Sequence, residues 1–371
     1  MAKTNPGGSG KSPLLRIAKR EDIPRWKAWL IRLIAVVLAL AVDGLIIFAI
    51  VKLNPVEVYQ AMFSGAFGTA RRSWVSIRDI TILLSIGIGL APAFKMKFWN
   101  LGAEGQILVG GVATAGCMIY FGGHIPNWLL LIVMALASII AGGIWGLIPA
   151  AAKARWDTNE SLFTLMLNYV AIQLTSYAVA RWENPVGSNT VGIINQNTRA
   201  GWFPELFGQA YGLNVLLAII LMVGMYAYLQ YTKQGYEIAV AGESYNTARY
   251  AGINMTKFYL RTMLISGAIC GFSGFIAVAG ASHTIATDTA GGRGFTAIIV
   301  AWLAKFNPFV MVLISALLVF LGNGATEIAS RYNLNDYASQ MIEGIILFFI
   351  LGSEFFINYR IIPRGKEVRQ A

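Results

Sequence analysis

A cluster of polar side chains interrupts the apolar sequence between Phe98 and Gln106. The stretch reads Phe-Trp-Asn-Leu-Gly-Ala-Glu-Gly-Gln, and long apolar runs flank it on both sides. An ionised carboxylate at membrane depth costs at least ~2.5 kcal/mol, so ionisable residues in a membrane usually face a cavity or a partner group. The spacing predicts that Asn100, Glu104 and Gln106 line or support a polar pathway. Phe98 and Trp99 would offer surfaces on which a base or a sugar stacks.

The composition excludes a soluble globule of this size. Hydrophobic residues make up 56% of the 371 residues and charged residues only 13%, which leaves too little polar surface for a soluble fold. A membrane-spanning helix needs ~20 mostly apolar residues. Such windows occur at 30–53, 77–95, 101–121, 126–150, 160–182, 212–231, 258–282, 308–327 and 338–357, with a shorter one at 294–305. Because the runs are continuous rather than alternating, we expect an all-α membrane protein of about ten transmembrane helices.

The basic residues indicate which loops face the cytoplasm. The net charge is +11, and the basic residues gather beside the apolar windows on one side, as the positive-inside rule expects. Residues 1–28 are therefore expected to be a basic cytoplasmic segment, 29–357 the transmembrane domain and 358–371 a cytoplasmic tail. The loop 183–211 contains one basic residue, Arg199, and is expected outside. The basic residues do not form a patch with interleaved aromatic residues, so the lipid bilayer, and not nucleic acid, is the expected partner.

Two parts of the chain resemble one another weakly. A Gly-rich apolar run at 83–94 precedes Gly102-Ala-Glu-Gly105, and a similar run at 266–275 precedes Gly292-Arg-Gly294. The two parts begin on opposite sides of the membrane, so we expect an inverted internal repeat with Gly-broken helices, as in many transporters. Gly-rich helix packing alone is the alternative explanation.

The expected cytoplasmic loop 233–257 contains signals for a helix of its own. Ser244 is suited to cap a short helix over 245–250, and Gly252 is suited to end it. Such a helix could dock into a groove of a soluble partner. An ordinary amphipathic linker at the membrane surface is the alternative.

Other polar residues have expected structural roles. Asn168 is expected to bridge helices through side-chain hydrogen bonds. Asn159 and Glu160 are suited to form a helix N-cap and a first-turn acid.

Four motifs follow one another along the chain. They are the stretch 98–106, then Asn159-Glu-Ser-Leu-Phe-Thr-Leu-Met-Leu-Asn168-Tyr, then Gly242-Glu-Ser-Tyr-Asn-Thr-Ala-Arg-Tyr-Ala-Gly-Ile253, and then Gly294-Phe-Thr-Ala-Ile-Ile-Val-Ala with Asn307-Pro308. Together they resemble the permease subunits of bacterial sugar-type ABC importers, in the branched-chain amino acid and ribose permease superfamily, and within it the nucleoside-importer branch. The resemblance covers about residues 77–357. Trp99 and Lys305-Phe306 depart from the family pattern, which leaves the solute open.

The resemblance implies a type II ABC importer fold and a permease for nucleosides or related ribose-like solutes. It implies a place in the bacterial inner membrane, with both termini cytoplasmic. Its partners would be ABC ATPase subunits, a second permease subunit, identical or homologous, and an extracytoplasmic solute-binding protein. This chain would bind no cofactor, because the ATPase uses the ATP. The loop 233–257 would be the coupling loop, with ATPase contacts from Gly242, Glu243, Asn246, Ala248, Tyr250, Ala251 and Gly252.

An ion-coupled secondary transporter is the alternative function, with Glu104, Asp43 or Glu343 carrying a coupling proton. A docking helix in the loop 233–257 would favour the importer, since an ion-coupled carrier has no need of one. We do not expect an enzyme, because the sequence offers no catalytic constellation. In Gly7-Gly-Ser-Gly-Lys11-Ser12 the first glycine of a phosphate-binding loop is missing. The two histidines and two cysteines are isolated, so no metal site is expected.

Overall fold

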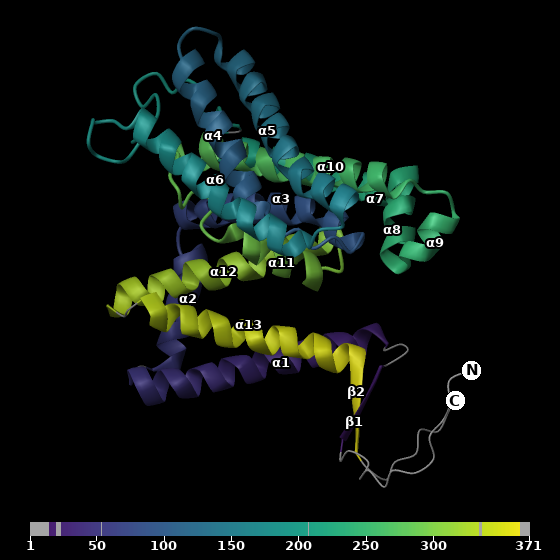
Figure 1. Ribbon diagram of the computed structural model, residues 1–371. Coiled ribbons are helices and arrows are strands. Elements are labelled where there is room, and N and C mark those ends of the chain that lie inside the picture. Colours follow the sequence, from purple (N-terminus) through teal and green to yellow (C-terminus); the bar gives the residue numbers. More distant parts are fainter. Residues whose placement is uncertain (1–14, 20–23, 53, 207, 334–335, 364–371) are drawn as a thin grey trace. The chain divides into compact units, whose positions relative to one another are not determined.

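The computed structural model describes residues 15–19, 24–52, 54–206, 208–333 and 336–363 (Figure 1). These residues are predominantly helical, as the sequence predicts. They divide into two units, one up to Phe63 and from Gly324 onward, the other from Ser64 to Asn323. The N-terminal basic segment up to residue 14, with its glycine-rich stretch, and the tail from residue 364 lie outside the described residues.

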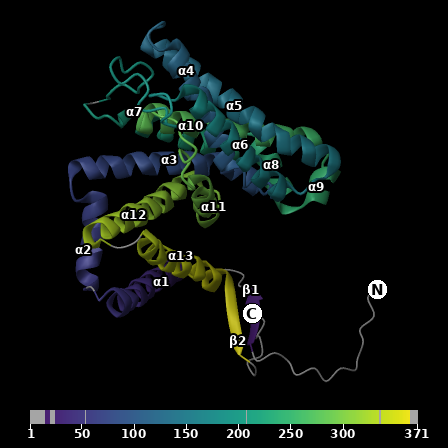
Figure 2. The ribbon, with the colours of Figure 1, turned by 60° about the vertical axis from the view of Figure 1, so that its left-hand side comes forward.

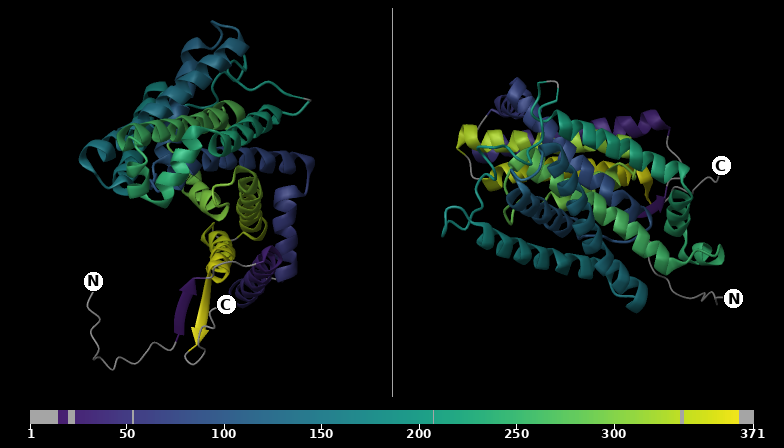
Figure 3. Two further views of the ribbon diagram at one scale, coloured as in Figure 1. Left: turned by 90° about the vertical axis from the view of Figure 1, so that its right-hand side faces the viewer. Right: turned by 90° about the horizontal axis from the view of Figure 1, so that it is seen from above.

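The first unit brings the two ends of the described chain together. Its elements are β1 (Leu15–Lys19), α1 (Arg25–Ile46), the π-helix η1 (Ile47–Val51), most of α2 (Pro55–Phe67), the end of α12 (Pro308–Tyr332), α13 (Asp336–Asn358) and β2 (Tyr359–Pro363). The two strands pair antiparallel, with Leu15 opposite Pro363 (Figure 3). This short ribbon is an addition to the predicted all-helical fold. The sequence windows also missed α2, where Pro55 begins the helix with a backbone angle already suited to it.

The second unit holds most of the predicted motifs. Its elements are α3 (Ala70–Lys95), α4 (Ala103–Phe121), α5 (Asn127–Trp156), α6 (Glu160–Trp182), α7 (Gly212–Tyr231), α8 (Lys233–Glu243), α9 (Tyr245–Tyr250), α10 (Met255–Ala277) with the π-helix η2 (Val278–Ser282), α11 (Arg293–Leu303) and the larger part of α12. Six helices of the described residues are long and apolar enough to cross a membrane, namely α3, α5, α6, α7, α10 with η2, and α12. Helix α11 is short, as predicted for 294–305.

Glycine faces bring α10 into close contact with α4 and α5. Gly142 and Gly146 on α5 face Gly267 and Gly271 on α10, each pair four residues apart. A Cβ atom added to Gly142 would lie 2.5 Å from the Cα atom of Gly271, and one added to Gly110 on α4 would lie 2.6 Å from the same atom. Small residues at this spacing let transmembrane helices approach backbone to backbone. The core of the second unit is therefore formed where α4, α5 and α10 meet.

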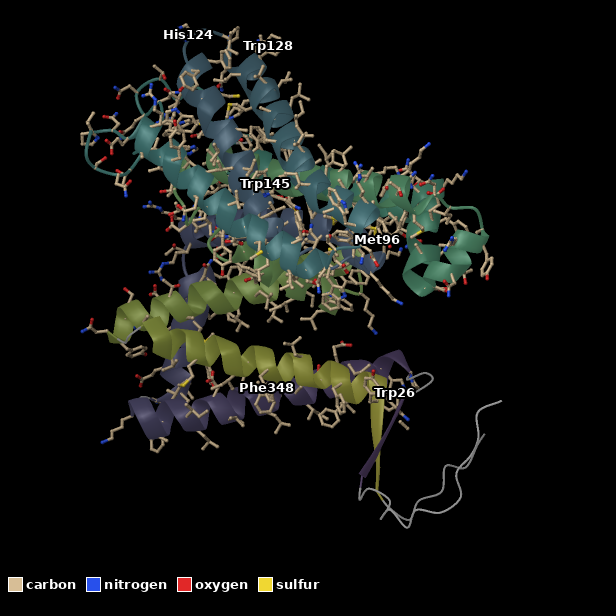
Figure 4. The ribbon with its side chains drawn as sticks, viewed as in Figure 1. Trp26, Met96, His124, Trp128, Trp145 and Phe348 are labelled. Carbon is tan, nitrogen blue, oxygen red and sulfur yellow. The ribbon has the colours of Figure 1, made fainter. Side chains whose placement is uncertain are left out.

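The two ends of the second unit carry different segments. The long loop between α6 and α7 lies at one end, and α8 and α9 lie at the other (Figures 1 and 2). His124 and Trp128, at the α4–α5 turn, lie at the same end of the unit as the α6–α7 loop. Met96 lies at the opposite end, on the side of α8 (Figure 4). The sequence analysis predicts these segments on opposite sides of the membrane.

Candidate functional site

The polar stretch between α3 and α4 is held in place by α6. The backbone N–H of Leu101 donates to the hydroxyl oxygen of Thr164 at 3.1 Å. Asn168 accepts from the N–H of Gly105 at 2.9 Å and donates to the carbonyl oxygen of Leu101 at 2.8 Å. Asn168 therefore bridges α6 to the start of α4, as predicted.

Asn100 and Gln106 are buried and hydrogen-bonded within the chain. The side-chain amide of Asn100 donates to Gln106 Oε1 and to the hydroxyl of Ser266 on α10, each at 3.4 Å. Its Oδ1 atom accepts from the N–H of Gly102 at 3.0 Å. These contacts fix the turn that enters α4. In the described unit Asn100 and Gln106 support this turn and expose little surface to a solute.

The two aromatic residues of the stretch have different environments. Phe98 is buried, with its ring 6.0 Å from that of Tyr259. Trp99 is 46% exposed and stacks on Trp302 of α11, with ring centroids 5.5 Å apart. Phe94 contacts both indoles edge-on. The accessible aromatic surface is thus the Trp99–Trp302 pair. Trp302 was not predicted from the sequence, because no local pattern connects α11 to residue 99.

Glu104 binds the N-terminus of α11. Its Oε1 atom accepts from the N–H of Gly292 at 2.7 Å, and its Oε2 atom accepts from the N–H of Gly294 at 2.8 Å. Gly292 is the N-cap residue of α11 and has no side chain to cap its own helix. Glu104 supplies that cap from another helix. The two Gly-containing segments that resemble each other in sequence therefore touch.

Two charged residues beside this contact were not predicted. Arg293, the first residue of α11, forms an ion pair with Asp79 of α3 at 3.4 Å. Asp79 also pairs with Arg78 at 2.9 Å. The start of α11 thus contacts acidic side chains from both α3 and α4.

The α6–α7 loop closes over the end of α10. The backbone N–H of Ile194 donates to the carbonyl oxygen of His283 at 2.8 Å. The indole N–H of Trp202 donates to the carbonyl oxygen of Ile194 at 2.9 Å. The rings of Trp202 and His283 stack 3.8 Å apart. Beneath this loop lies a pocket of about 400 Å³, lined by Ser176, Val179, residues 189–193 and residues 284–287.

The stacked histidine predicts that this loop is sensitive to acid. Burial first, and then the charge of Arg78, lowers the pKa of His283 below its usual 6.5. The folded state thus favours the neutral imidazole of His283. The contribution of His283 to the free energy of unfolding is therefore fully present above about pH 6.5 and is lost as the pH falls below that value. We expect the melting temperature in detergent to fall more between pH 7.5 and pH 5.5 for the wild type than for His283→Phe.

His124→Phe is the matched control, because His124 is the second histidine of the chain and is exposed. This variant should keep the wild-type pH dependence. Equal pH dependence in His283→Phe and the wild type would contradict the assignment.

The helix predicted inside the loop 233–257 is present with the predicted limits. Helix α9 spans Tyr245–Tyr250, Ser244 Oγ accepts from the N–H of Thr247 at 3.3 Å, and Gly252 has a φ of 77°. A further helix, α8, precedes it. Of the seven expected contact residues, Gly242 and Ala248 are buried within this chain. The exposed ones are Glu243, Asn246, Tyr250, Ala251 and Gly252.

The remaining polar expectations concern α6 and two acidic residues. Asn159 caps α6 by accepting from the N–H of Leu162 at 3.1 Å, and Glu160 pairs with Lys153 at 3.2 Å. Both match the predicted cap and first-turn acid. Asp43 on α1 is buried. The side chain of Glu343 lies outside the part that the structure describes. Among the described residues, no three His, Cys, Asp or Glu side chains are grouped so as to hold a metal ion.

Comparison with known proteins gives the family. Residues 75–351 match the family described as "Branched-chain amino acid transport system / permease component". The glucose ABC transporter permease protein of Haloferax volcanii is 31% identical over 94% of this chain and 93% of its own length. The guanosine ABC transporter permease protein of Bacillus subtilis is 29% identical over 89% and 95%. The nucleoside ABC transporter permease protein of Lactococcus lactis is 24% identical over 92% and 94%. The chain is thus a helical, multi-pass membrane protein that belongs to this family of transport-system permease components.

Proposed function

We propose that the chain is the membrane permease subunit of an ATP-driven importer for nucleosides or related ribose-like solutes. The exposed helix α9 is the main support, because it offers a soluble partner a short helix at one end of the second unit. The printed names of the three relatives also support it, since they describe permease proteins for glucose, guanosine and nucleosides.

The proposed topology has ten transmembrane helices in a type II importer fold, with both termini in the cytoplasm. The end that carries α8 and α9 then faces the cytoplasm, and the α6–α7 loop faces outward. An inverted repeat relates the part that contains Glu104 to the part that contains α11. The contact between Glu104 and the start of α11 supports the repeat, because solute routes in such transporters lie between the repeats, at the ends of broken helices.

The proposed route passes the Trp99–Trp302 pair. The indoles are 46% and 44% exposed, and aromatic faces of this kind stack on nucleobases and on the apolar faces of sugars. Phe98, Asn100 and Gln106 support this surface from within, and Glu104 fixes α11 beside it. A binding protein would deliver the solute to the outer end, near the pocket under the α6–α7 loop.

The proposed complex contains two ATPase subunits and a second permease, which is identical or homologous. ATP hydrolysis takes place in the ATPase subunits, so this chain acts as a transport subunit and binds no cofactor itself. Closure of the ATPases moves α9, and the difference in solute affinity between the two access states is coupled to the nucleotide cycle.

Uptake by reconstituted protein tests this function. Proteoliposomes that contain the permease, its ATPase and the binding protein should accumulate a radiolabelled nucleoside only with ATP, and should continue to do so when a protonophore collapses the proton gradient. Uptake by this chain alone, driven by a pH gradient, would instead establish an ion-coupled carrier. One observation favours the ion-coupled carrier, because neither carboxylate oxygen of the buried Asp43 has a hydrogen-bond partner among the residues that the structure describes.

Tyr250 is the sharpest probe of the docking helix. Its side chain is 93% exposed, so Tyr250→Ala removes partner contacts without opening the fold, whereas a bulky residue at the buried Ala248 would disturb α9 itself. Buried interface tyrosines are often worth 2 kcal/mol or more, so we expect ATP-dependent uptake to fall about tenfold or more. Uptake and solute-stimulated ATPase activity are measured on the same vesicles.

Tyr177→Ala on α6 is the matched control, since Tyr177 is an exposed tyrosine away from α9. It should transport at the wild-type rate. Wild-type uptake and stimulation in Tyr250→Ala would argue against docking through α9.

A further inference from the structure

The N-terminus of α11 has the features of an anion-binding site. The N–H group of Gly292 donates to one oxygen of a single carboxylate and that of Gly294 donates to the other, and the N-terminal end of a helix carries partial positive charge. In transporters with broken helices, such ends often point at the anionic group of a substrate. Arg293 adds a full positive charge at the same position.

Acidic side chains of this chain already occupy that site. The carboxylate of Glu104 takes both N–H groups, and the carboxylate of Asp79 takes the guanidinium of Arg293. Asp79 and Glu104 together balance the charges of Arg78 and Arg293. An incoming anion would therefore meet two carboxylates where it needs free donors.

The fit between Glu104 and α11 is too close for another group to enter beside the carboxylate. A Cβ atom added to Gly294 would lie 2.6 Å from both the backbone nitrogen and Oε2 of Glu104. The contact is nevertheless reachable, because Gly292 is exposed and Glu104 is partly exposed. The exposed Trp302 lies on the same short helix.

We propose that Glu104 selects solutes by their charge. Its carboxylate acts as a built-in anion that closes the N-terminal end of α11 to negatively charged solutes. The route then accepts uncharged compounds such as nucleosides and rejects their phosphate esters. This inference rests on the proposed function, since it assigns the substrate class of the same route. The reported relatives are named for the uncharged solutes glucose and guanosine and for nucleosides, which agrees with it.

Inorganic phosphate is the probe that tests this inference on the purified full-length chain in detergent. Melting temperature is measured against phosphate concentration, with chloride at matched ionic strength as the reference. Glu104→Ala frees both N–H groups, so phosphate should raise its melting temperature saturably, with half of the rise reached at a phosphate concentration about tenfold or more below the highest one tested. The wild type should show no phosphate-specific rise.

Two further variants keep the test decisive. Asp79→Asn frees Arg293 while Glu104 stays in place, so it should gain a weaker phosphate response, and it provides the answer if Glu104→Ala fails to fold. Glu160→Ala removes a first-turn glutamate from α6, where Asn159 still caps the helix and Lys153 still pairs with Asp157. This control should respond to phosphate no more than the wild type does.

The inference is overturned if folded Glu104→Ala shows no saturable phosphate response, if the wild type responds equally, or if Glu160→Ala gains the same response. Where only Asp79→Asn folds, a missing response in that variant overturns it. The measurement needs neither ATP nor the ATPase. Its failure is therefore distinct from a failure of ATP-dependent uptake, which would overturn the proposed function.

Discussion

Gly271→Leu is expected to prevent the chain from folding. A Cβ atom at position 271 would lie 2.8 Å from the Cα atom of Gly142 and would also clash with the carbonyl oxygen of Ser138. Overpacking a core costs about 1–3 kcal/mol when side chains can move aside, but here the neighbours are backbone atoms of α5. We expect the yield of monodisperse protein in detergent to fall to near zero, with Gly271→Ala showing a lowered melting temperature.

Gly224 provides the matched control for this prediction. It lies inside α7, and a Cβ atom there would meet nothing within 4 Å. Gly224→Leu should therefore fold with a melting temperature equal to or above that of the wild type, because glycine costs ~1 kcal/mol in a helix interior. A Gly271→Leu protein with the wild-type melting temperature would refute the close contact of α5 and α10.

Asn168→Leu is expected to destabilise the start of α4 strongly. The change leaves the N–H of Gly105 and the carbonyl of Leu101 without their partner. Each buried group left unpaired costs ~1–3 kcal/mol, so the total loss is on the order of 2–6 kcal/mol. The melting temperature in detergent measures the loss. Asn168→Asp keeps the acceptor for Gly105 and should fall between the wild type and the leucine variant.

Asn214 is the matched control, because it is equally buried but poorly bonded. Its amide donates one long bond of 3.4 Å to the carbonyl of Gly280, and its Oδ1 atom has no hydrogen-bond partner within the described part of the chain. Asn214→Leu should thus cost less than Asn168→Leu. The reverse order would show that the hydrogen bonds of Asn168 do not hold the turn.

Local signals made α9 predictable from the sequence. Ser244 and Gly252 each act on the backbone of their own turn, so their residue types alone locate both ends of the helix. Helix α2 also has a local start signal, because Asn54 Oδ1 accepts from the N–H of Val56 at 3.0 Å and Pro55 is the first helical residue. A search for long apolar runs passes over it, because its sequence mixes apolar and polar residues. Helix α3 begins at Ala70, ahead of the apolar window from 77, because Thr69 caps a first turn that contains two arginines.

The residue types of the polar stretch 98–106 stand out in the sequence, but its contacts do not. Asn100, Glu104 and Gln106 are unusual between two long apolar runs, which is what singles them out. What they bind is decided by packing between distant segments, which a single sequence does not contain. The bond from Glu104 to Gly292 joins residues 188 positions apart. Trp302 and Asp79 likewise look like ordinary helix residues until α11 is placed beside α3 and α4.

The glycine contacts of α10 bear on how the permease changes its access. Where two backbones touch without side chains between them, there is no deformable layer through which one helix can slide past the other. We therefore expect helices α4, α5 and α10 to move together as one block. In the proposed importer, a change of access would then bend the chain outside this block and leave the three helices in contact.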